Sequence, residues 1–98
     1  MIIRYKNKRI QNVCIDSKKA TRLYGNEMAQ KIQQRIQEIE SADSVDFMIQ
    51  YKIGRCHPLN NDRDGQFAVD LVHPNRLVFE KEDEAINVVR ILEVVDYH

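Results

Sequence analysis

The sequence is poor in the residues that build several common sites: its 98 residues include three glycines, two prolines, two cysteines and no tryptophan. It has no glycine-rich phosphate loop and no HExxH motif, which disfavours nucleotide hydrolysis and zinc chemistry. Cys14 and Cys56 are far apart and lack CxxC spacing, so they predict neither a metal site nor a redox site. We expect no cofactor, no metal and two reduced thiols.

The sequence also lacks a long apolar run and an excess of charge of either sign. No segment approaches the roughly 18 apolar residues that a membrane span needs. The opening MIIRYKNKRI is too short and too polar for a signal peptide, so we expect a cytoplasmic protein. Fifteen basic residues balance fifteen acidic ones, so the whole chain has no general attraction to nucleic acid. Any binding of nucleic acid must come from a local patch.

Length and composition indicate a single domain over residues 1–98. A hydrophobic share of 43% and a charged share of 31% are ordinary for a globular protein with a packed core. Charge is uneven along the chain, because lysine and arginine predominate from Met1 to Lys52 whereas Glu80 to Glu84 is acidic. We predict that the acidic run is the solvated tip of a turn between two strands.

The first half of the sequence predicts a short strand followed by helices. Residues 1–5 have the β-branched and aromatic side chains typical of a strand, and the segment up to Cys14 is predicted to hold one helical turn or more. Residues 17–40 predict a longer helix, because apolar side chains recur at spacings of three or four, at Ala20, Tyr24, Met28, Ile32, Ile36 and Ile39.

Polar residues and glycine predict where these helices begin and end. Asp16 or Ser17 is suited to cap the long helix, and Gly25 is expected to divide it in two, because glycine costs about 1 kcal/mol in a helix interior. Residues 41–44 end the helix and lead into a short turn through residues 45–50. Basic side chains, Arg35 among them, are expected on the remaining helix surface.

After Gly54 the apolar pattern changes to a period of two, which is typical of strands. Residues 66–72 alternate between two faces, and residues 76–79 continue the pattern after a His-Pro-Asn turn, which predicts a hairpin. Residues 85–95 are rich in valine and isoleucine and predict a last, more buried strand. Helices followed by an antiparallel sheet indicate an α+β domain.

Histidine is the side chain best suited to cleave RNA without a metal. That reaction needs a base for the 2′-hydroxyl proton, an acid for the leaving 5′-oxygen and a cation for the charge that builds on phosphate. Histidine serves as acid or base because its ordinary pKa of about 6.5 is close to neutral pH. The hairpin region brings in His57, and His98 ends the last strand, whereas His73 is expected in the solvated hairpin turn.

The C-terminal residues Asp96, Tyr97 and His98 form an unusual tail, since three adjacent residues capable of acid-base chemistry directly follow an apolar strand. A frayed polar end is the alternative interpretation. Three arginines are candidates for binding phosphate, because a guanidinium contacts phosphate oxygens in a bidentate manner. Arg76 heads a strand beside the predicted site, Arg55 is close to His57, and Arg63 either binds phosphate or pairs with its aspartate neighbours.

These residues, in this order, resemble the HigB branch of the RelE-like toxins, the toxic halves of bacterial toxin-antitoxin pairs. The resemblance covers residues 55–98 well and the helical first half loosely. It rests on five stretches: Arg55-Cys56-His57-Pro58-Leu59, Asp62-Arg63, Gly65-Gln66-Phe67-Ala68-Val69-Asp70-Leu71, His73-Pro74-Asn75-Arg76-Leu77-Val78-Phe79-Glu80 and Val95-Asp96-Tyr97-His98.

The resemblance implies helices packed on a small twisted antiparallel sheet and an endoribonuclease that cuts mRNA on the translating ribosome. The 2′-hydroxyl is then the nucleophile. The residues that match catalytic positions of the family are His57, Asp96, Tyr97 and His98, and Arg76 matches a basic residue of the family's catalytic site. A HigA-like antitoxin with a helix-turn-helix domain is the implied partner, in a system of the plasmid-maintenance type. The resemblance does not say which histidine is the acid.

The sequence departs from this family in two respects. Family members commonly carry lysine where this chain has Asn60 and Asp64, and they are usually basic whereas this chain is neutral. Fewer cations predict weaker, more salt-sensitive RNA binding. Three alternatives therefore stay open: a protein of the same fold that binds its antitoxin without cutting RNA, a ParE-type gyrase inhibitor, and an ordinary α+β interaction domain.

Overall fold

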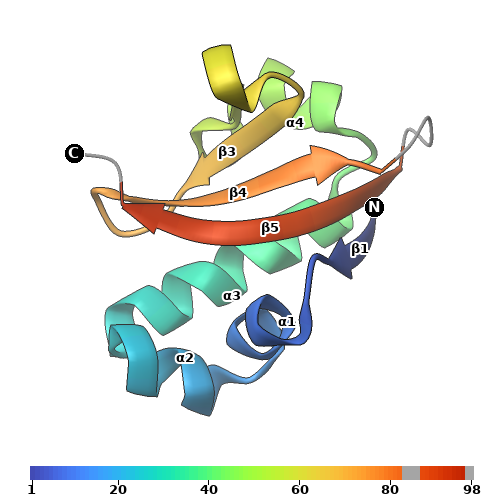
Figure 1. The fold of residues 1–98 in the computed structure, drawn as a ribbon. Helices are drawn as coiled ribbons and strands as arrows, with labels where there is room; N and C mark the ends of the chain where they lie inside the picture. Colours follow the sequence, from blue (N-terminus) through green and yellow to red (C-terminus); the bar gives the residue numbers. More distant parts are fainter. Residues whose placement is uncertain (83–86, 97–98) are drawn as a thin grey trace.

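The computed structural model describes residues 1–82 and 87–96 of the chain. Figure 1 shows a layer of helices against one sheet. Within the described residues the elements are β1 (Ile2–Tyr5), α1 (Lys8–Ile15), α2 (Ser17–Tyr24), α3 (Asn26–Ser41), α4 (Val45–Gln50), the 3₁₀ turn η1 (Ile53–Arg55), β2 (His57–Pro58), the 3₁₀ turn η2 (Asn61–Arg63), β3 (Gln66–Asp70), β4 (Asn75–Lys81) and β5 (Val88–Asp96).

Polar side chains cap three of the helices in the described part of the chain. Asn7, Asp16 and Ser44 cap α1, α2 and α4, and each side-chain oxygen accepts a hydrogen bond of 3.0 Å from a backbone N–H of the first turn. Such caps satisfy N–H groups that have no partner inside the helix. Gly25 separates α2 from α3 with a φ of 88°, a conformation that favours glycine. The predicted cap at Asp16 and the division at Gly25 are confirmed.

The strands form a mixed sheet in the order β1-β5-β4-β3-β2. β2 to β5 pair in antiparallel fashion with their neighbours, and β1 pairs parallel with β5, where Tyr5 is opposite Ile91. The predicted α+β class and the hairpin of β3 and β4 are confirmed. The expectation of an antiparallel sheet is wrong for one strand, because β1 runs in the same direction as β5.

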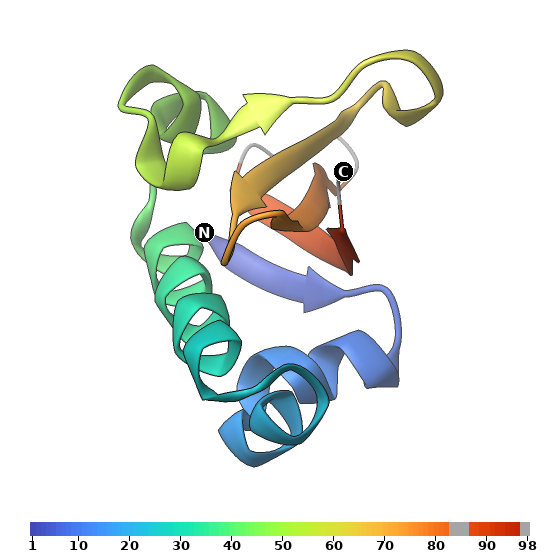
Figure 2. The same ribbon diagram turned by 90° about the vertical axis from the view of Figure 1, so that its left-hand side faces the viewer.

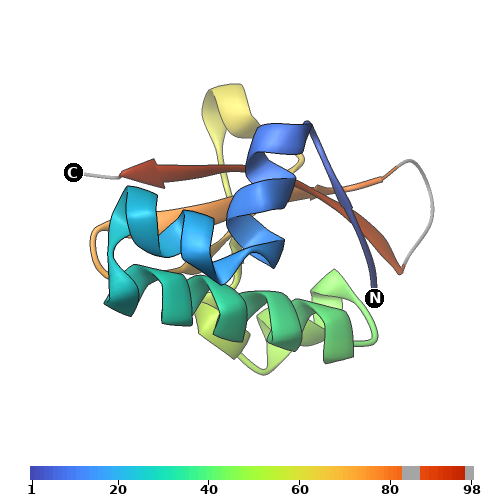
Figure 3. The ribbon, with the colours of Figure 1, turned by 90° about the horizontal axis from the view of Figure 1, so that it is seen from below.

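The core fills the space between the helices and one face of the sheet. Figures 1 and 3 show α1, α2 and α3 on that side of the sheet. The largest side chains there are at most 1% exposed and include Ile32 and Ile39 of α3 and Leu77, Phe79 and Ile91 of the sheet. No helix in the described part of the chain is long and apolar enough to span a membrane.

The other face of the sheet is polar. Side chains alternate between the faces of a strand, so residues directly opposite one another in the register share a face. The register therefore places polar side chains on the face turned away from the core, among them His57, Gln66, Asp70, Arg76 and Glu93.

Two helical residues do not follow the sequence prediction. Tyr24, expected in the apolar stripe, is 40% exposed, because α2 ends there and α3 starts in a new direction (Figure 2). Arg35, expected on the surface, has a side chain that is 13% exposed. Tyr97 and His98, together with Asp83 and Glu84 of the predicted acidic turn, lie outside the described residues.

Candidate functional site

His57 lies on a short edge strand that the sequence did not reveal. β2 consists of His57 and Pro58 and pairs with β3, where Ala68 is opposite His57. Two residues are too few to show a period-two pattern, so the strand exists only through its pairing. It brings the imidazole onto the polar face of the sheet, next to β3 and β4.

The hydrogen bonds of His57 fix its tautomer. Nδ1 lies 2.8 Å from the carbonyl oxygen of Arg55, and because a carbonyl only accepts, Nδ1 must carry a hydrogen and donate it. In the neutral imidazole the lone pair is then on Nε2. This atom faces Nη1 of Arg76 at 3.4 Å, a long hydrogen bond. Nε2 is thus the ring atom able to accept a proton from a substrate.

Asp70 joins two arginines beside this histidine. Nε of Arg55 donates to Oδ2 of Asp70, and Nε of Arg76 lies 3.5 Å from Oδ1. Together with the two contacts of His57, these interactions close a ring, called here the His57 ring, of Arg55, Asp70, Arg76 and His57. Asp70 contacts both guanidiniums, and His57 contacts the backbone of Arg55 and the side chain of Arg76, so these groups are oriented before a substrate binds.

The turn before His57 uses left-handed backbone conformations. Gly54 has a φ of 60°, and Arg55, which has a Cβ, has a φ of 54°. For a residue other than glycine this conformation costs about 1 kcal/mol or more. The turn directs the Arg55 carbonyl back to the imidazole two residues later. Such strained residues recur where the backbone positions a functional group.

Arg35 of α3 supports the His57 ring from the helical layer. Its Nε donates to the backbone carbonyl oxygen of Asp70 at 2.6 Å, and its Nη1 pairs with Glu38 at 2.8 Å. A Cβ on Gly54 would lie 3.0 Å from Cδ of Arg35, so the glycine leaves room for this side chain. Arg35 therefore connects α3 both to the turn before His57 and to the end of β3.

A second cationic group lies on the same face of the sheet. Nη1 of Arg63, from η2, donates to Oε1 of Gln66 at 3.0 Å and to Oε2 of Glu93 at 3.4 Å. The alternative that Arg63 pairs with its aspartate neighbours is therefore wrong, because its ion-pair partner is Glu93. Ala68 and Val78, each 0% exposed, lie on this face between the Arg63 pair and the His57 ring and form its floor.

The candidate residues of the tail are only partly described. Asp96 is the last residue of β5 and is opposite Asn75, one position beyond the Arg76–Val95 pair. The end of β5 is therefore adjacent to Arg76 in the sheet register. The acid-base roles assigned to Tyr97 and His98 concern residues outside those described. His73 is exposed in the turn between β3 and β4, as predicted.

The two cysteines lie away from this face. Both are free thiols, and burial raises the pKa of Cys14 and of Cys56 to about 12. They are neutral at physiological pH and therefore poor nucleophiles. Among the described histidine, cysteine and acidic side chains, no group of three is arranged to hold a metal ion.

Sequence reasoning missed the residues that hold the site together. Asp70 and Glu93 pair with the arginines, and Arg35 contacts the backbone of Asp70. A charged residue on the otherwise apolar stretch from Phe67 to Leu71 was a signal for Asp70, because a lone aspartate in a strand needs a partner. Glu93 and Arg35 carried no comparable signal, since their partners are 30 and 35 residues away in the chain.

The chain shares its fold with bacterial toxins of known structure, although its sequence identity to them is low. No protein-family model matches the chain, and no curated protein matches it significantly. A chain of the YoeB–YefM complex from Staphylococcus aureus superposes with a TM-score of 0.65 at 19% identity, covering 100% of this chain and 97% of that one.

A YoeB/ParE toxin from Agrobacterium tumefaciens is also similar, with a TM-score of 0.64, 12% identity and full coverage of both chains. A YoeB dimer from Staphylococcus aureus has a TM-score of 0.63 at 19% identity. At such low identity the likeness establishes the fold and not the activity. The protein therefore has the α+β fold found in YoeB-type and ParE-type toxins, a mixed sheet with helices on one face.

Proposed function

We propose that this protein is the toxin of a toxin-antitoxin pair, a single-domain cytoplasmic endoribonuclease of the HigB kind that cleaves mRNA on the ribosome without a metal. The observation that carries the proposal is the His57 ring, in which an oriented imidazole and two guanidiniums share one face of the sheet. The shared fold supports it. The partner is then a HigA-like helix-turn-helix antitoxin.

In the proposed reaction Nε2 of His57 takes the proton of a ribose 2′-hydroxyl, whose oxygen attacks the adjacent phosphorus. The bond to the 5′-oxygen of the next nucleotide breaks, leaving a 2′,3′-cyclic phosphate and a 5′-hydroxyl. Arg76 is adjacent to Nε2 and stabilises the charge that builds on the phosphate. The leaving oxygen takes its proton from the tail, where His98, Tyr97 and Asp96 are the candidates.

Arg55 and Arg63 are the proposed RNA-binding residues. The Arg55 side chain is 68% exposed although it pairs with Asp70, and that of Arg63 is 34% exposed. They lie at opposite ends of β3, at Asp70 and Gln66, about 13 Å apart along an extended strand. Phosphates on either side of a cleaved linkage can thus be bound at both ends of the Ala68–Val78 floor.

The test is brief expression in a bacterium, followed by mapping of new 5′ ends on translated and untranslated copies of one reporter mRNA. We expect cuts in the translated copy only, their loss with His57→Gln or His98→Ala, and no change with the matched control His73→Gln. Cuts that persist in the His57→Gln variant would falsify the proposed base. Induction of a DNA-damage response without mRNA cuts would instead indicate a ParE-type target.

A specific observation favours a second candidate, a toxin fold that binds its antitoxin without cutting RNA. Arg55 and Arg76 share one carboxylate, and the loop before β3 carries Asn60 and Asp64 where related toxins have lysine. The discriminating variant is Asn60→Lys with Asp64→Lys. Toxicity that appears only in this variant supports the second candidate, and toxicity already present in the natural chain excludes it.

A further inference from the structure

The His57 ring joins two segments that are far apart in the chain. Arg55 and His57 belong to η1 and the edge strand β2, whereas Asp70 and Arg76 belong to the hairpin of β3 and β4. The side-chain contacts between the two segments restrain their separation only loosely. The Arg55 side chain is 68% exposed, and the contact between His57 and Arg76 is 3.4 Å long. A fixed geometry of the ring therefore needs a further restraint.

The backbone pairing of β2 supplies little of that restraint. β2 has two residues and lies at the edge of the sheet, and its Pro58 has no N–H to donate to β3. Beyond the strand, the N–H of Leu59 donates to the carbonyl oxygen of Gln66 at 2.8 Å. Segments with few backbone hydrogen bonds open locally at a low free energy. The position of His57 therefore depends on what fixes the turn that precedes it.

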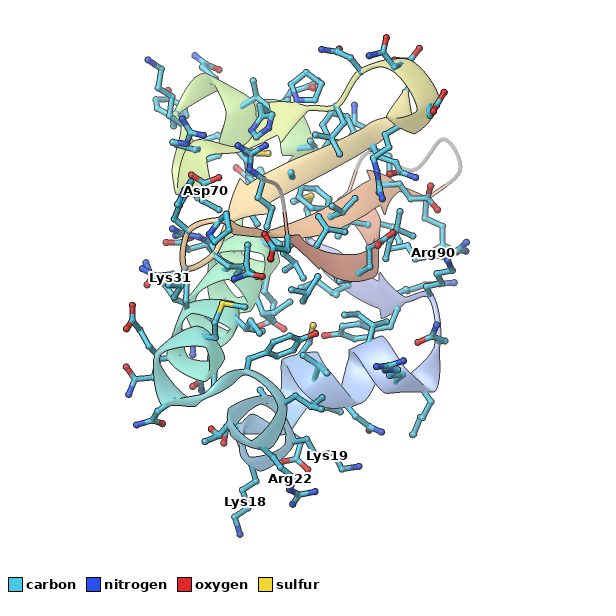
Figure 4. The ribbon with its side chains drawn as sticks, turned by 60° about the vertical axis from the view of Figure 1, so that its left-hand side comes forward. Lys18, Lys19, Arg22, Lys31, Asp70 and Arg90 are labelled. Carbon is cyan, nitrogen blue, oxygen red and sulfur yellow. The ribbon has the colours of Figure 1, made fainter. Side chains whose placement is uncertain are left out.

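Arg35 of α3 fills the space between that turn and the end of β3. Its side chain is 13% exposed, and its Nε donates to the carbonyl oxygen of Asp70, the last residue of β3, at 2.6 Å. In Figure 4 the labelled Lys31, one helical turn before Arg35, marks the stretch of α3 next to Asp70. On its other side the Arg35 side chain packs against Gly54, where a Cβ would lie 3.0 Å from both Cδ and Nε. One side chain thus contacts both segments that form the ring.

Arginine suits this place better than lysine does. The Nε of Arg35 donates to Asp70 from the middle of the side chain, while Nη1 at its end pairs with Glu38 at 2.8 Å. A lysine has a methylene where arginine has Nε, and its donors are all on one terminal nitrogen. The flat guanidinium also fits beside Gly54, where a Cβ would lie within 3.3 Å of Cδ, Nε and Cζ. The place therefore requires the specific shape and donor positions of arginine in addition to its charge.

We propose that Arg35 is a positioning residue, which holds the turn before His57 and the end of β3 at a fixed separation and so sets the cleavage rate without contacting RNA. Through Gly54 it fixes the turn whose Arg55 carbonyl accepts from Nδ1 of His57 at 2.8 Å. Through the backbone of Asp70 it fixes the carboxylate that contacts both guanidiniums. A displacement of about 1 Å between reacting groups costs up to about 100-fold in rate. The inference rests on the proposed function, because it concerns the rate of that reaction.

The position of Arg35 suits an action on the ring and not on RNA. α3 packs against the face of the sheet opposite the polar face (Figures 1 and 3). Both ends of the guanidinium are engaged, Nε by the carbonyl oxygen of Asp70 and Nη1 by Glu38. A substitution of Arg35 that keeps the positive charge should therefore lower the cleavage rate and leave the affinity for RNA unchanged.

The experiment compares Arg35→Lys with the natural full-length chain in two assays: single-turnover cleavage of an mRNA on the ribosome, and binding of the same mRNA with a blocked 2′-hydroxyl. We expect the rate to fall about tenfold or more and the affinity to stay within about twofold. The matched control is Glu38→Gln, which removes the ion pair with Arg35 and leaves the bond to Asp70, so its rate should stay within about twofold. A full rate in Arg35→Lys, or equal slowing in Glu38→Gln, would overturn the inference.

A measurement on His57 itself separates positioning from a general loss of stability. Nitrogen-15 chemical shifts of the imidazole show which ring nitrogen carries the hydrogen, and that tautomer depends on the hydrogen bond of the other segment to the ring. The shifts are recorded on the free chain at about pH 8.5, above the ordinary imidazole pKa of about 6.5. We expect the hydrogen on Nδ1 in the natural chain and in Glu38→Gln, and a mixture of tautomers in Arg35→Lys. Identical shifts in all three chains would overturn the inference.

A second pair of variants tests the same contact without removing a donor. Gly54→Ala crowds Arg35 from the side of the turn, whereas Gly25→Ala adds a Cβ with no atom within 4 Å at another glycine of positive φ. Gly54→Ala should slow cleavage and change the imidazole shifts, and Gly25→Ala should do neither. If the natural chain cuts no RNA, the proposed function fails. The imidazole shifts, which need no RNA, then decide separately whether Arg35 positions His57.

Discussion

The helical half, residues 1–52, and the sheet half, residues 53–98, differ in charge and in how that charge is used. The first contains ten basic and six acidic residues and the second five and nine, so net charges of +4 and −4 cancel in the whole chain. All five cations of the sheet half form ion pairs. Within the described residues only Arg4 and Arg35 do so in the helical half.

This difference assigns different tasks to the two halves. Figure 4 shows Lys18, Lys19 and Arg22 extending from α2, far from Asp70 and Arg90 on the sheet. Solvated, unpaired cations contribute attraction at long range, whereas arginines held by carboxylates contribute orientation at short range. A neutral chain thus retains a basic surface, and the arginines of its candidate site are held in place by carboxylates of the same sheet.

The largest expected effect comes from opening the His57 ring. Asp70→Asn removes the carboxylate that both Arg55 and Arg76 contact, and misplaced guanidiniums should lower the single-turnover cleavage rate about 100-fold. Affinity for RNA with a blocked 2′-hydroxyl should stay the same or rise, because one negative charge is lost. Asp70→Glu should keep part of the rate.

The matched control for that change is Asp43→Asn, which removes an exposed carboxylate of the helical half and should leave the rate unchanged. If Asp70→Asn cleaves RNA as fast as the natural chain does, the ring is an ion-pair network of the fold and does not position the site.

Alkaline pH should destabilise both halves through their buried thiols. Burial raises the pKa of Cys14, in the helical half, and of Cys56, in the sheet half, from the ordinary 9.0 to about 12. The unfolded chain loses these protons first, so stability is complete below pH 9 and falls up to about pH 12. Each thiol should cost about 1.4 kcal/mol per pH unit in that window.

Urea denaturation at a series of pH values between 8 and about 11 measures this slope. Cys14→Ala and Cys56→Ala each lower stability at neutral pH by leaving a small cavity. Each substitution should nevertheless make the fall of stability with pH less steep, by the roughly 1.4 kcal/mol per pH unit that one thiol contributes. An unchanged slope in both variants would show that the thiols ionise equally in the folded and unfolded chain.

A smaller effect is expected where the halves are joined. Gly54→Ala adds a Cβ 3.0 Å from Arg35 at a φ of 60°, and should cost about 2 kcal/mol from strain and crowding together. Gly25→Ala, at a φ of 88° with no atom within 4 Å, should cost about 1 kcal/mol from backbone strain alone. The difference in stability between the two variants, measured by thermal unfolding, gives the cost of crowding Arg35. Equal losses of stability would show that this crowding costs nothing.

The smallest effects separate paired from unpaired cations. Arg90→Gln removes a 2.8 Å ion pair from Glu82, whose side chain is 12% exposed, and should cost about 1–2 kcal/mol because that carboxylate keeps only a longer contact with Arg4. Lys18→Gln should change the stability by less than about 0.5 kcal/mol. If urea denaturation shows equal losses of stability for Arg90→Gln and Lys18→Gln, the paired and the unpaired cations do not differ in what they contribute to stability.

Some elements were predictable because the information is local. The caps at Asp16 and Ser44, the break at Gly25 and the hairpin from Gln66 to Lys81 depend on residues close together in the chain. Period and capping rules apply directly to such segments. The parallel pairing of β1 with β5 and the two-residue strand β2 were not predictable, since both depend on partners brought together by the rest of the fold.

The candidate site follows the same division. Sequence patterns selected His57, Arg55, Arg63 and Arg76 as chemically competent residues, and the structure brings three of them together around Asp70, which the patterns did not select. Arg63 lies at the other end of the floor with Glu93. The charge and the ordinary pKa of a side chain show which step of a reaction it can assist. They do not show which carboxylate will orient it in the folded protein.

By itself the sequence determined the fold class, the helix ends, the hairpin and the set of acid-base and cationic residues, because helix periodicity, caps and turn chemistry act over a few residues. Only the tertiary structure decided the mixed sheet, the tautomer of His57 and the ion pairs of the arginines in the sheet half. These features join atoms whose residues are far apart along the chain, and packing alone sets their distances.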